Sequence, residues 1–384
     1  MRFLDRLIDN HPAPVAGATE GAAPPQAAQA VPFIVGSQRY YEAPFFTDVF
    51  QLGANSQEFV HNITPGGFLN GIVLQVTSTG GALGGGALVA DSPFSIITSI
   101  TLEDISGGPI LYPMAGFTAA MVQKYLRPWE GAVDKRPDFS NTVNPAFTLR
   151  IPIELRDTLG AVANTDARAQ YRLRYTLSTL AKSGQFGLVN GGAPTGPTVT
   201  VNGYFDTWAQ PDIADLLGNP IEQTPPGLAA NRFVMHEVPG LNAGANTVRH
   251  TLVGNEIRGI LWVVRDSTQA RINLTDANAG PIDFRLDNRR LWKMRQSQVV
   301  EEMCKFYDDL QNGTQTRETG VYAFPRFRNP GSQKGQHWLQ TVEQSLLQAE
   351  LNGTDLGANA PGTLEIVYDE LAIAGALDPA LEGL

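Results

Sequence analysis

The chain has 384 residues, of which 42% are apolar and 17% charged, with 39 glycines and 26 prolines. This length exceeds one ordinary domain and, at roughly 150 residues per domain, predicts two, while the many turn-forming residues favour β-rich domains. The net charge of -10 comes without any block of lysine and arginine, so the sequence argues against direct binding of nucleic acid.

The first 32 residues form a segment of their own. Residues 1–10 predict a short amphipathic helix, and residues 11–32 are an Ala/Pro/Gly/Gln tract typical of an extended arm. Because so short a helix is not stable alone, we expect it to lie on another surface. Its apolar face, the candidate contact with a membrane or a neighbouring molecule, consists of Phe3, Leu4, Leu7 and Ile8.

Two features bear on the location of the protein. Asp5 and Asp9 interrupt the N-terminal apolar residues, which therefore lack the continuous stretch of a secretory signal, and no segment approaches 18 uninterrupted apolar residues. Cys304 is the single cysteine, so no disulfide can form within the chain. We expect a protein that is neither exported nor inserted in a membrane.

Alternating residues predict β-strands after the arm. Residues 148–155 place Leu149, Ile151, Ile153 and Leu155 on one face, while Arg150, Pro152, Glu154 and Arg156 lie on the other. Residues 170–180 repeat this alternation, and residues 198–208 form another β-branched and aromatic run. Glycine-rich turns separate these segments and favour an antiparallel arrangement.

The chain also repeats its own pattern after about 180 residues, and the matches keep their order. Three strand-like segments close each half: 147–155, 170–180 and 198–208 in the first, and 321–327, 337–351 and 363–373 in the second. The other matches are 59–76 with 247–264, including His61 with His250 and Gly71-Ile72 with Gly259-Ile260; 100–104 with 284–288; 111–114 with 291–294; and Lys124-Tyr125 with Lys305-Phe306.

Each half predicts one helix between its middle and later strands, within residues 111–126 and 291–307. The order of strands, one helix and further strands occurs once in each half. This order predicts an all-β fold of two tandem jelly-roll sandwiches, each with an inserted helix. The predicted limits are 33–210 for the first jelly roll, 211–230 for a linker and 231–384 for the second. The apolar helix faces are Phe117, Met121 and Tyr125 in the first half, and Val299, Val300, Met303 and Tyr307 in the second.

The search for reactive groups yields no catalytic, cofactor-binding or metal-binding residues. The five histidines form no HxH or HExxH pair, and His61 and His250 are interpreted as equivalent strand positions. The glycine-rich segment 79–87 has no following Lys-Ser/Thr and opens no helix, so it does not predict a phosphate site. Cys304 is interpreted as a packed residue, and Glu301-Glu302 as part of a solvated helix face.

Two other classes stay open. A two-domain carbohydrate-binding or receptor-binding protein could use the same sandwiches, although such a module is expected to be exported. A bicupin-like metalloenzyme would also have two jelly rolls, but it needs several histidines and a glutamate converging in each barrel. We therefore interpret the chain as a protein without enzymatic activity.

The tandem sandwiches, the two inserted helices and the N-terminal helix with its arm resemble the double jelly-roll major capsid proteins of tailless icosahedral viruses. This lineage includes tectivirus-like phages and the adenovirus hexon, and the chain is similar in length to the compact phage members. The resemblance covers most of the chain. It implies a structural coat protein of a virion, assembled in the host cytoplasm as homotrimeric, pseudo-hexameric capsomers.

The resemblance also implies partners. Neighbouring capsomers and minor capsid proteins would contact the trimer, and an internal membrane would meet the apolar face of the N-terminal helix, with Arg2 and Arg6 pairing with lipid phosphates. Two similar domains in one chain let a threefold assembly present six roughly equivalent sides, which suits a continuous lattice.

Overall fold

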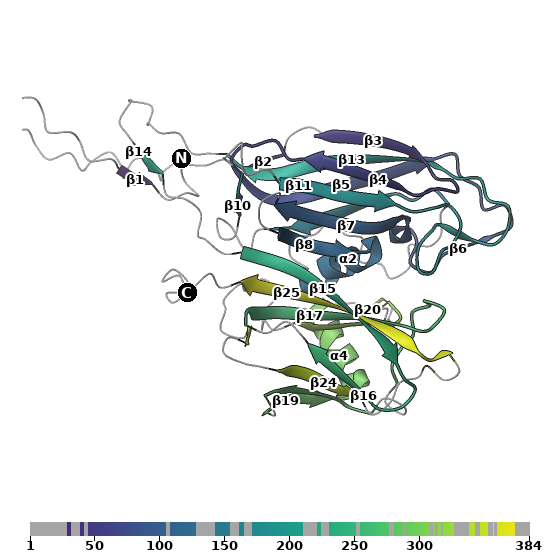
Figure 1. The fold of residues 1–384 in the computed structure, drawn as a ribbon, viewed down its shortest axis with the longest axis vertical. Helices are drawn as coiled ribbons and strands as arrows, with labels where there is room; N and C mark the ends of the chain where they lie inside the picture. Colours follow the sequence, from purple (N-terminus) through teal and green to yellow (C-terminus); the bar gives the residue numbers. More distant parts are fainter. Residues whose placement is uncertain are drawn as a thin grey trace, which may run out of the picture.

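Two β-sandwiches lie side by side in the computed structural model, with the earlier part of the chain in one and the later part in the other (Figure 1). The structure describes residues 29–31, 39–41, 45–104, 108–127, 143–153, 161–164, 171–209, 221–223, 230–250, 254–275, 280–287, 289–307, 310–311, 314–315, 318–325, 338–341, 346–351, 356 and 359–372. The predicted N-terminal helix and most of the arm lie outside these residues.

The first sandwich consists of two four-stranded antiparallel layers. One has the order β3-β13-β5-β9, and the other has the order β4-β11-β7-β8. The strands are β3 (Phe46–Gln51), β4 (Gln57–Asn62), β5 (Phe68–Thr79), β7 (Ile97–Asp104), β8 (Gly108–Met114), β9 (Phe147–Pro152), β11 (Tyr171–Leu177) and β13 (Thr198–Trp208).

The second sandwich repeats this plan. Its layers have the orders β15-β25-β17-β22 and β16-β24-β18-β19. The strands are β15 (Ala230–Leu241), β16 (Asn246–His250), β17 (Glu256–Arg265), β18 (Ile282–Leu286), β19 (Arg289–Met294), β22 (Val321–Pro325), β24 (Leu347–Leu351) and β25 (Gly362–Ala372).

The two sandwiches have the same topology. When the eight strands of each are lettered B to I along the chain, both consist of a B-I-D-G sheet and a C-H-E-F sheet, which is the jelly-roll order. The prediction of tandem jelly rolls is confirmed. The predicted domain limits stay predictions: strand I of the first sandwich ends at Trp208, and strand B of the second begins at Ala230.

Shorter elements complete the fold. They are β1 (Gln29–Val31), β2 (Arg39–Tyr41), β6 (Ala87–Leu88), η1 (Phe94–Ile96), β10 (Val162–Ala163), β12 (Val189–Asn190), β14 (Ile221–Gln223), β20 (Leu310–Gln311), β21 (Thr314–Gln315) and β23 (Leu339–Gln340). Within the described part of the chain, no helix is long and apolar enough to cross a membrane.

The pairing registers confirm the internal repeat. Leu173 on strand H pairs with His61 on one side and Leu102 on the other. Leu347 pairs in the same way with His250 and Leu286. The two D-strand glycines also agree: Gly71 lies opposite Asp206 and Gly259 lies opposite Asp369. The positions matched from the sequence on strands C, D and E therefore occupy equivalent places in the two sandwiches.

Strand F departs from the sequence match by two residues. Ile100 and Phe284 are equivalent by register, yet Ile100 pairs with Met114 whereas Phe284 pairs with Trp292. The first strand pair contains two register shifts and the second contains one. A β-bulge changes the register without changing the residue types, so the sequence did not reveal this difference.

Each half has its helix between strands F and G, as predicted. The helices are α2 (Gly116–Leu126) and α4 (Gln296–Tyr307), and each begins two residues after the methionine that ends strand F. The predicted inward residues Leu149, Ile151 and Ile153 are buried, as are the alternate residues of β11. Leu155 lies outside the described residues.

Candidate functional site

The two sandwiches meet along one strand edge and one helix. Strand β8 pairs in parallel with β15 at Leu111 and Phe233, so the C-H-E-F sheet of the first sandwich continues into the B-I-D-G sheet of the second. Helix α2 lies next to this boundary, between the sandwiches (Figure 1). We call this region the junction. It is the candidate functional site because it fixes how the two domains are placed.

Helix α2 is buried on all sides. It packs on β7 and β9 of its own sandwich and on β17 and β22 of the other, and every residue from Gly116 to Leu126 is buried. The predicted face of Phe117, Met121 and Tyr125 is confirmed as buried. The expectation of a single apolar face is incomplete, because the second sandwich covers the side that would otherwise contact water.

A glycine allows the close approach of α2 to strand D. A Cβ atom on Gly259 would lie 2.7 Å from Leu126 Cδ2, whereas a Cβ on the equivalent Gly71 would have no neighbour closer than 3.3 Å. Contacts under 3.0 Å force a neighbour to move, and this neighbour belongs to a helix that is enclosed by protein.

We therefore expect Gly259→Ala to destabilise the protein by about 1–3 kcal/mol more than Gly71→Ala. Both replacements restrict the unfolded backbone equally, so the difference isolates the packing at α2. Urea-induced unfolding of the two variants measures it. Equal stabilities would mean that α2 can shift away from β17 without cost.

Two ion pairs join α2 to the second sandwich. Lys124 Nζ lies 2.8 Å from Glu318 Oε1 with both side chains 1% exposed, and the Tyr125 hydroxyl donates to the other oxygen of Glu318 at 2.5 Å. One residue after the helix, Arg127 Nη2 lies 3.1 Å from Asp369 Oδ1, and both are buried. The C-terminal end of α2 thus faces carboxylates through its basic residues. Basic side chains at this end also interact favourably with the helix dipole.

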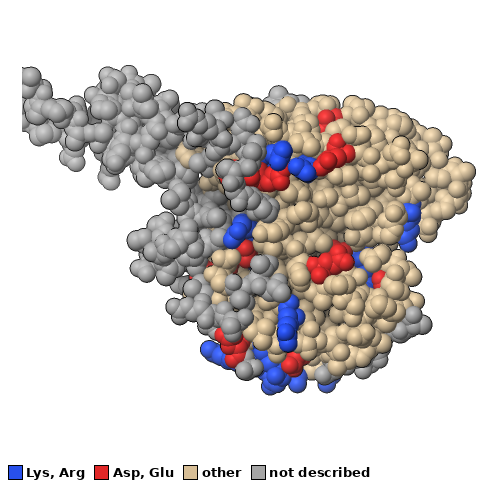
Figure 2. All heavy atoms as spheres, in the orientation of Figure 1, with Lys and Arg blue, Asp and Glu red and all other residues tan. Residues whose placement is uncertain are grey.

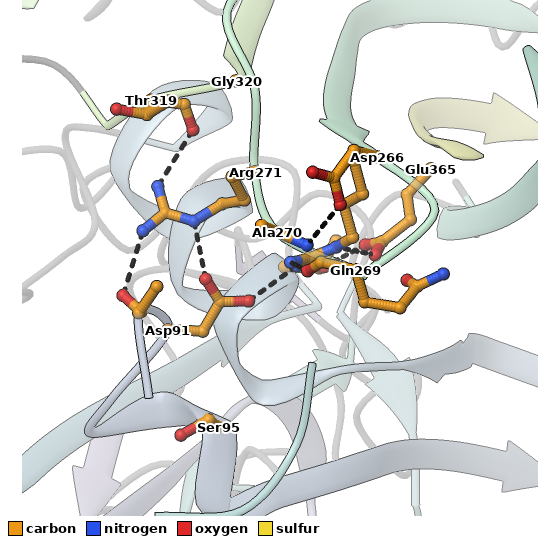
Figure 3. Close-up of polar contacts among 12 residues, drawn as sticks. Asp91, Ser95, Asp266, Gln269, Ala270, Arg271, Thr319, Gly320 and Glu365 are labelled. Atoms are coloured by element: carbon orange, nitrogen blue, oxygen red, sulfur yellow. Dashed lines mark hydrogen bonds and ion pairs between the residues drawn. The ribbon is translucent and has the colours of Figure 1, made fainter. Parts of the chain in front are cut away.

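A second group of charges surrounds Asp91, which belongs to the first sandwich (Figure 3). Its two carboxylate oxygens lie 2.7 Å from Arg265 Nη2 and 2.6 Å from Arg271 Nε, both of the second sandwich. Arg265 Nε also donates to Glu365 at 2.6 Å, and the Thr118 hydroxyl donates to Glu365 at 2.7 Å. Two arginines and two carboxylates give this group no net charge.

Burial acts to lower the pKa of Arg265, but the carboxylates of Glu365 and Asp91 outweigh it, so the pKa is raised and the guanidinium stays charged. Arg271 stacks over the Phe117 ring, with its Cζ 4.4 Å from the ring centroid. Such contacts hold the two domains in place. Among the described residues, no group of three or more His, Cys, Asp and Glu could hold a metal ion.

Helix α4 occupies in the second sandwich the place that α2 occupies in the first, but it is only partly covered. Helix α4 packs on β22 and buries Val299 and Met303, as predicted, while Val300 is half-buried. Ser297 and Gln298 are exposed near its N-terminus. The side chains of Cys304 and Tyr307 lie outside the described residues. Over its described side chains, 296–303, helix α4 thus has one covered face where α2 has two.

Other predicted site residues are not brought together. Phe3, Leu4, Leu7 and Ile8 lie outside the described residues. His61 Nε2 lies 2.6 Å from Asp48 and its ring stacks on Phe46 in the first sandwich, whereas His250 Nδ1 lies 2.6 Å from the Tyr368 hydroxyl in the second. The two histidines serve separate cores at equivalent strand positions.

Sequence reasoning missed the junction carboxylates. The signal was charge inside otherwise apolar strands: β17 carries Arg265 at its end, and β25 carries Glu365 and Asp369 within a long apolar run. Charged side chains are buried only when they are paired. These residues therefore indicated that another part of the protein covers the outer face of the B-I-D-G sheet of the second sandwich. Asp91, in a turn before η1, had no distinguishing pattern.

Comparison with known proteins identifies solved structures with a similar fold. No protein-family model matches the sequence, and no curated protein matches it at a significant level. Among solved structures, the STIV major capsid protein is similar with a TM-score of 0.57 and 12% identity, over 88% of this chain and 100% of that one. A structure of Sulfolobus Turreted Icosahedral Virus gives a TM-score of 0.60 with 11% identity, over 90% of this chain and 95% of that one.

The PBCV-1 virus capsid is similar as well, with a TM-score of 0.55 and 12% identity, over 87% of this chain and 94% of that one. These likenesses extend over both sandwiches. The chain has the double jelly-roll fold of viral major capsid proteins, and the predicted resemblance is confirmed at the level of fold.

Proposed function

We propose that this chain is the major capsid protein of an icosahedral virus and that its function is structural. The observation that carries the proposal is the pair of sandwiches with identical strand order, each with a helix between strands F and G. Solved structures with this plan over nearly their whole length are capsid proteins. A location in the virion capsid and the absence of enzymatic activity follow from this role.

The proposed capsomer is a homotrimer. Three chains supply six sandwiches of one plan, and the junction holds each pair through enclosed ion pairs. A rigid pair is what a threefold ring needs to present six similar sides, and similar sides allow side-to-side contacts to continue through a shell.

The finer parts of the proposal concern the host and the partners. A bacterial host agrees with the compact length of the chain, and assembly would take place in the host cytoplasm. Neighbouring capsomers and minor capsid proteins would contact the trimer. The N-terminal face of Phe3, Leu4, Leu7 and Ile8 would contact an internal membrane or an adjoining capsomer.

Light scattering of the purified full chain, followed by electron microscopy, tests this function. We expect three times the mass of one chain, stable on dilution, and particles with a nearly hexagonal outline that assemble into sheets or shells. A protein that stays monomeric at all concentrations and forms no ordered assemblies would contradict the proposal. Binding of a monomer to a glycan array would support a carbohydrate-binding protein instead.

A further inference from the structure

The outer face of the sheet β16-β24-β18-β19 in the second sandwich is basic. The pairing registers align its outward residues in two rows, with one residue from each strand in every row. The first row consists of Arg249, Gln348, Arg285 and Arg290. The second row consists of Thr247, Glu350, Asp283 and Lys293. We call these eight residues the basic face. In Figure 2 basic side chains gather at the lower end of the molecule, where Figure 1 places β16, β24 and β19.

Ion pairs fix part of the basic face. Arg285 Nη2 lies 3.1 Å from Asp283 Oδ2 and 2.9 Å from Glu350 Oε2, and Arg290 Nη2 lies 2.9 Å from Asp283 Oδ2. Burial acts to raise the pKa of Asp283, but hydrogen bonds from Arg290 and Arg285 and their charges outweigh it, so this pKa is lowered. Four basic and two acidic side chains leave the face with two positive charges, in a chain whose net charge is -10.

Two cations of the basic face are unpaired. Arg249 and Lys293 are exposed, and neither makes an ion pair within the part of the chain that the structure describes. Arg249 is on β16 and Lys293 is on β19, so three strand spacings, about 14 Å in all, separate them across the sheet. A ligand that contacts both therefore has to be extended and to carry more than one anionic group.

The first sandwich lacks this face. By the registers that the two sandwiches share, the row of Arg249, Gln348 and Arg285 corresponds to Val60, Arg174 and Thr101. The one arginine of that row, Arg174, is paired with Glu58 and Glu103. Two sandwiches of one plan thus differ here in charge, so the row of arginines is not a requirement of the fold.

The mixture of charges on the basic face indicates the chemistry of its ligand. Guanidinium groups donate strong hydrogen bonds to anionic groups such as sulfate. The carboxylate of Glu350, which is 35% exposed, can only accept hydrogen bonds, so it favours a ligand with O–H donors. A sulfated polysaccharide carries anionic groups and hydroxyl groups alternately along an extended chain. It therefore matches both kinds of side chain.

Other anionic partners fit less well. The carboxylates of Glu350 and Asp283 repel the phosphates of nucleic acid, and the eight residues include no aromatic side chain on which bases could stack. A membrane surface is favoured by apolar side chains that enter the lipid. The large exposed apolar residues of the described part of the chain are Val49 and Val60, and both belong to the first sandwich.

We propose that the basic face binds a sulfated polysaccharide, with sulfate groups on the arginine row and on Lys293 and with hydroxyl groups donating to Glu350. This inference goes beyond the proposed function, because it adds a binding activity to a structural protein. The basic face belongs to the C-H-E-F sheet, whereas the junction involves the B-I-D-G sheet of the same sandwich. A bound polysaccharide would therefore leave the pairing of the two sandwiches undisturbed.

A matched pair of substitutions tests the surface. Lys293→Gln removes an unpaired charge of the basic face, whereas Lys182→Gln makes the same change at an exposed position of the first sandwich. We expect the full chain to bind dextran sulfate but not dextran, as measured by isothermal titration calorimetry. Lys293→Gln and Arg249→Gln should each weaken the binding of dextran sulfate at least fivefold, and Lys182→Gln less than twofold. No binding by the wild-type protein, or equal losses at Lys293 and Lys182, would overturn the proposal.

A further substitution separates a polysaccharide from a ligand that is held by charge alone. Glu350→Gln removes a negative charge, so it should strengthen the binding of single-stranded DNA. The same substitution removes the carboxylate that accepts from hydroxyl groups, so we expect it to weaken the binding of dextran sulfate at least twofold. Tighter binding of dextran sulfate by Glu350→Gln would refute the polysaccharide assignment. Wild-type binding of DNA as tight as that of dextran sulfate would also refute it.

Light scattering separates this inference from the proposed function. Lys293→Gln is expected to keep the mass of the wild-type protein, and a smaller mass would show that the basic face joins copies of the chain and would overturn the assignment. A trimer that binds no dextran sulfate would refute this inference and leave the proposed capsid function standing. A monomer that binds dextran sulfate through Arg249 and Lys293 would support this inference and contradict the capsid function.

Discussion

Replacing Asp91 by alanine is expected to lower the free energy of unfolding by about 3–5 kcal/mol. The Asp91 side chain is 4% exposed and neutralises Arg265 and Arg271. Without it, the buried Arg265 keeps only the carboxylate of Glu365, and Arg271 keeps only the backbone carbonyls of Ala90 and Thr319. Urea-induced unfolding followed by circular dichroism, at one fixed protein concentration, measures the change.

The matched control is an exposed pair. Glu58 and Arg174 lie 3.3 Å apart with side chains 49% and 39% exposed, so Glu58→Ala should cost less than about 1 kcal/mol. Combining Asp91→Ala with Arg271→Leu should cost less than the sum of the single changes, because the unpaired charge is then removed. Additive losses would show that the two residues act independently.

The charges at the junction also bear on geometry. Asp91 comes from the first sandwich, and Arg265 and Arg271 come from the second, so their pairing requires one relative placement of the domains. An apolar contact tolerates sliding more readily than a set of ion pairs with fixed distances. Because three copies of the chain must close a ring in the proposed capsomer, a small error in this placement would be repeated three times.

The charged residues visible on the face shown in Figure 2 are few and are grouped, with most of the surface uncharged. Among the described residues of the first sandwich, Arg172 and Arg174 pair with Glu103 at 2.6 and 3.1 Å. A surface with paired charges and broad uncharged areas is compatible with extensive contacts to other proteins, since few unpaired charges would be buried there.

Much of the fold followed from the sequence because strands bury one face. In β11 the alternation of Tyr171, Leu173 and Tyr175 with arginines predicted the observed alternation of burial. The repeat added order: His61 and His250 marked the same place on strand C, and the registers confirm it. Matched positions in two halves constrain topology more than propensity does.

The junction could not be predicted from the sequence, for a physical reason. The residues of α2 do not record that a second sandwich covers them, and Lys124 and Arg127 resemble solvated residues until their carboxylates, about 190 and 240 positions away, are placed. Long-range pairs of this kind leave no local pattern. Asp91 was missed because its partners come from another domain.

Acid is expected to destabilise the second sandwich through His250. Burial, with a smaller contribution from His236, lowers the pKa of His250 to about 3 from the ordinary 6.5. The folded protein therefore keeps the ring neutral where the unfolded chain takes up a proton. The stabilisation is complete above pH 6.5 and declines as the pH falls towards 3, by about 1.4 kcal/mol per pH unit and about 5 kcal/mol in all.

Comparison with His250→Asn isolates this effect. Asparagine can still accept a hydrogen bond from the Tyr368 hydroxyl, which lies 2.6 Å from His250 Nδ1, but it does not titrate. Glu256 and Glu370, whose pKa values burial raises, titrate in both proteins and cancel in the difference. We expect the stability of the wild-type protein, measured by urea unfolding from pH 7 to pH 4, to fall about 3 kcal/mol more than that of the variant. Parallel curves would mean that the ring reaches water in the folded state, which its position between Trp262, Phe284 and Tyr368 argues against.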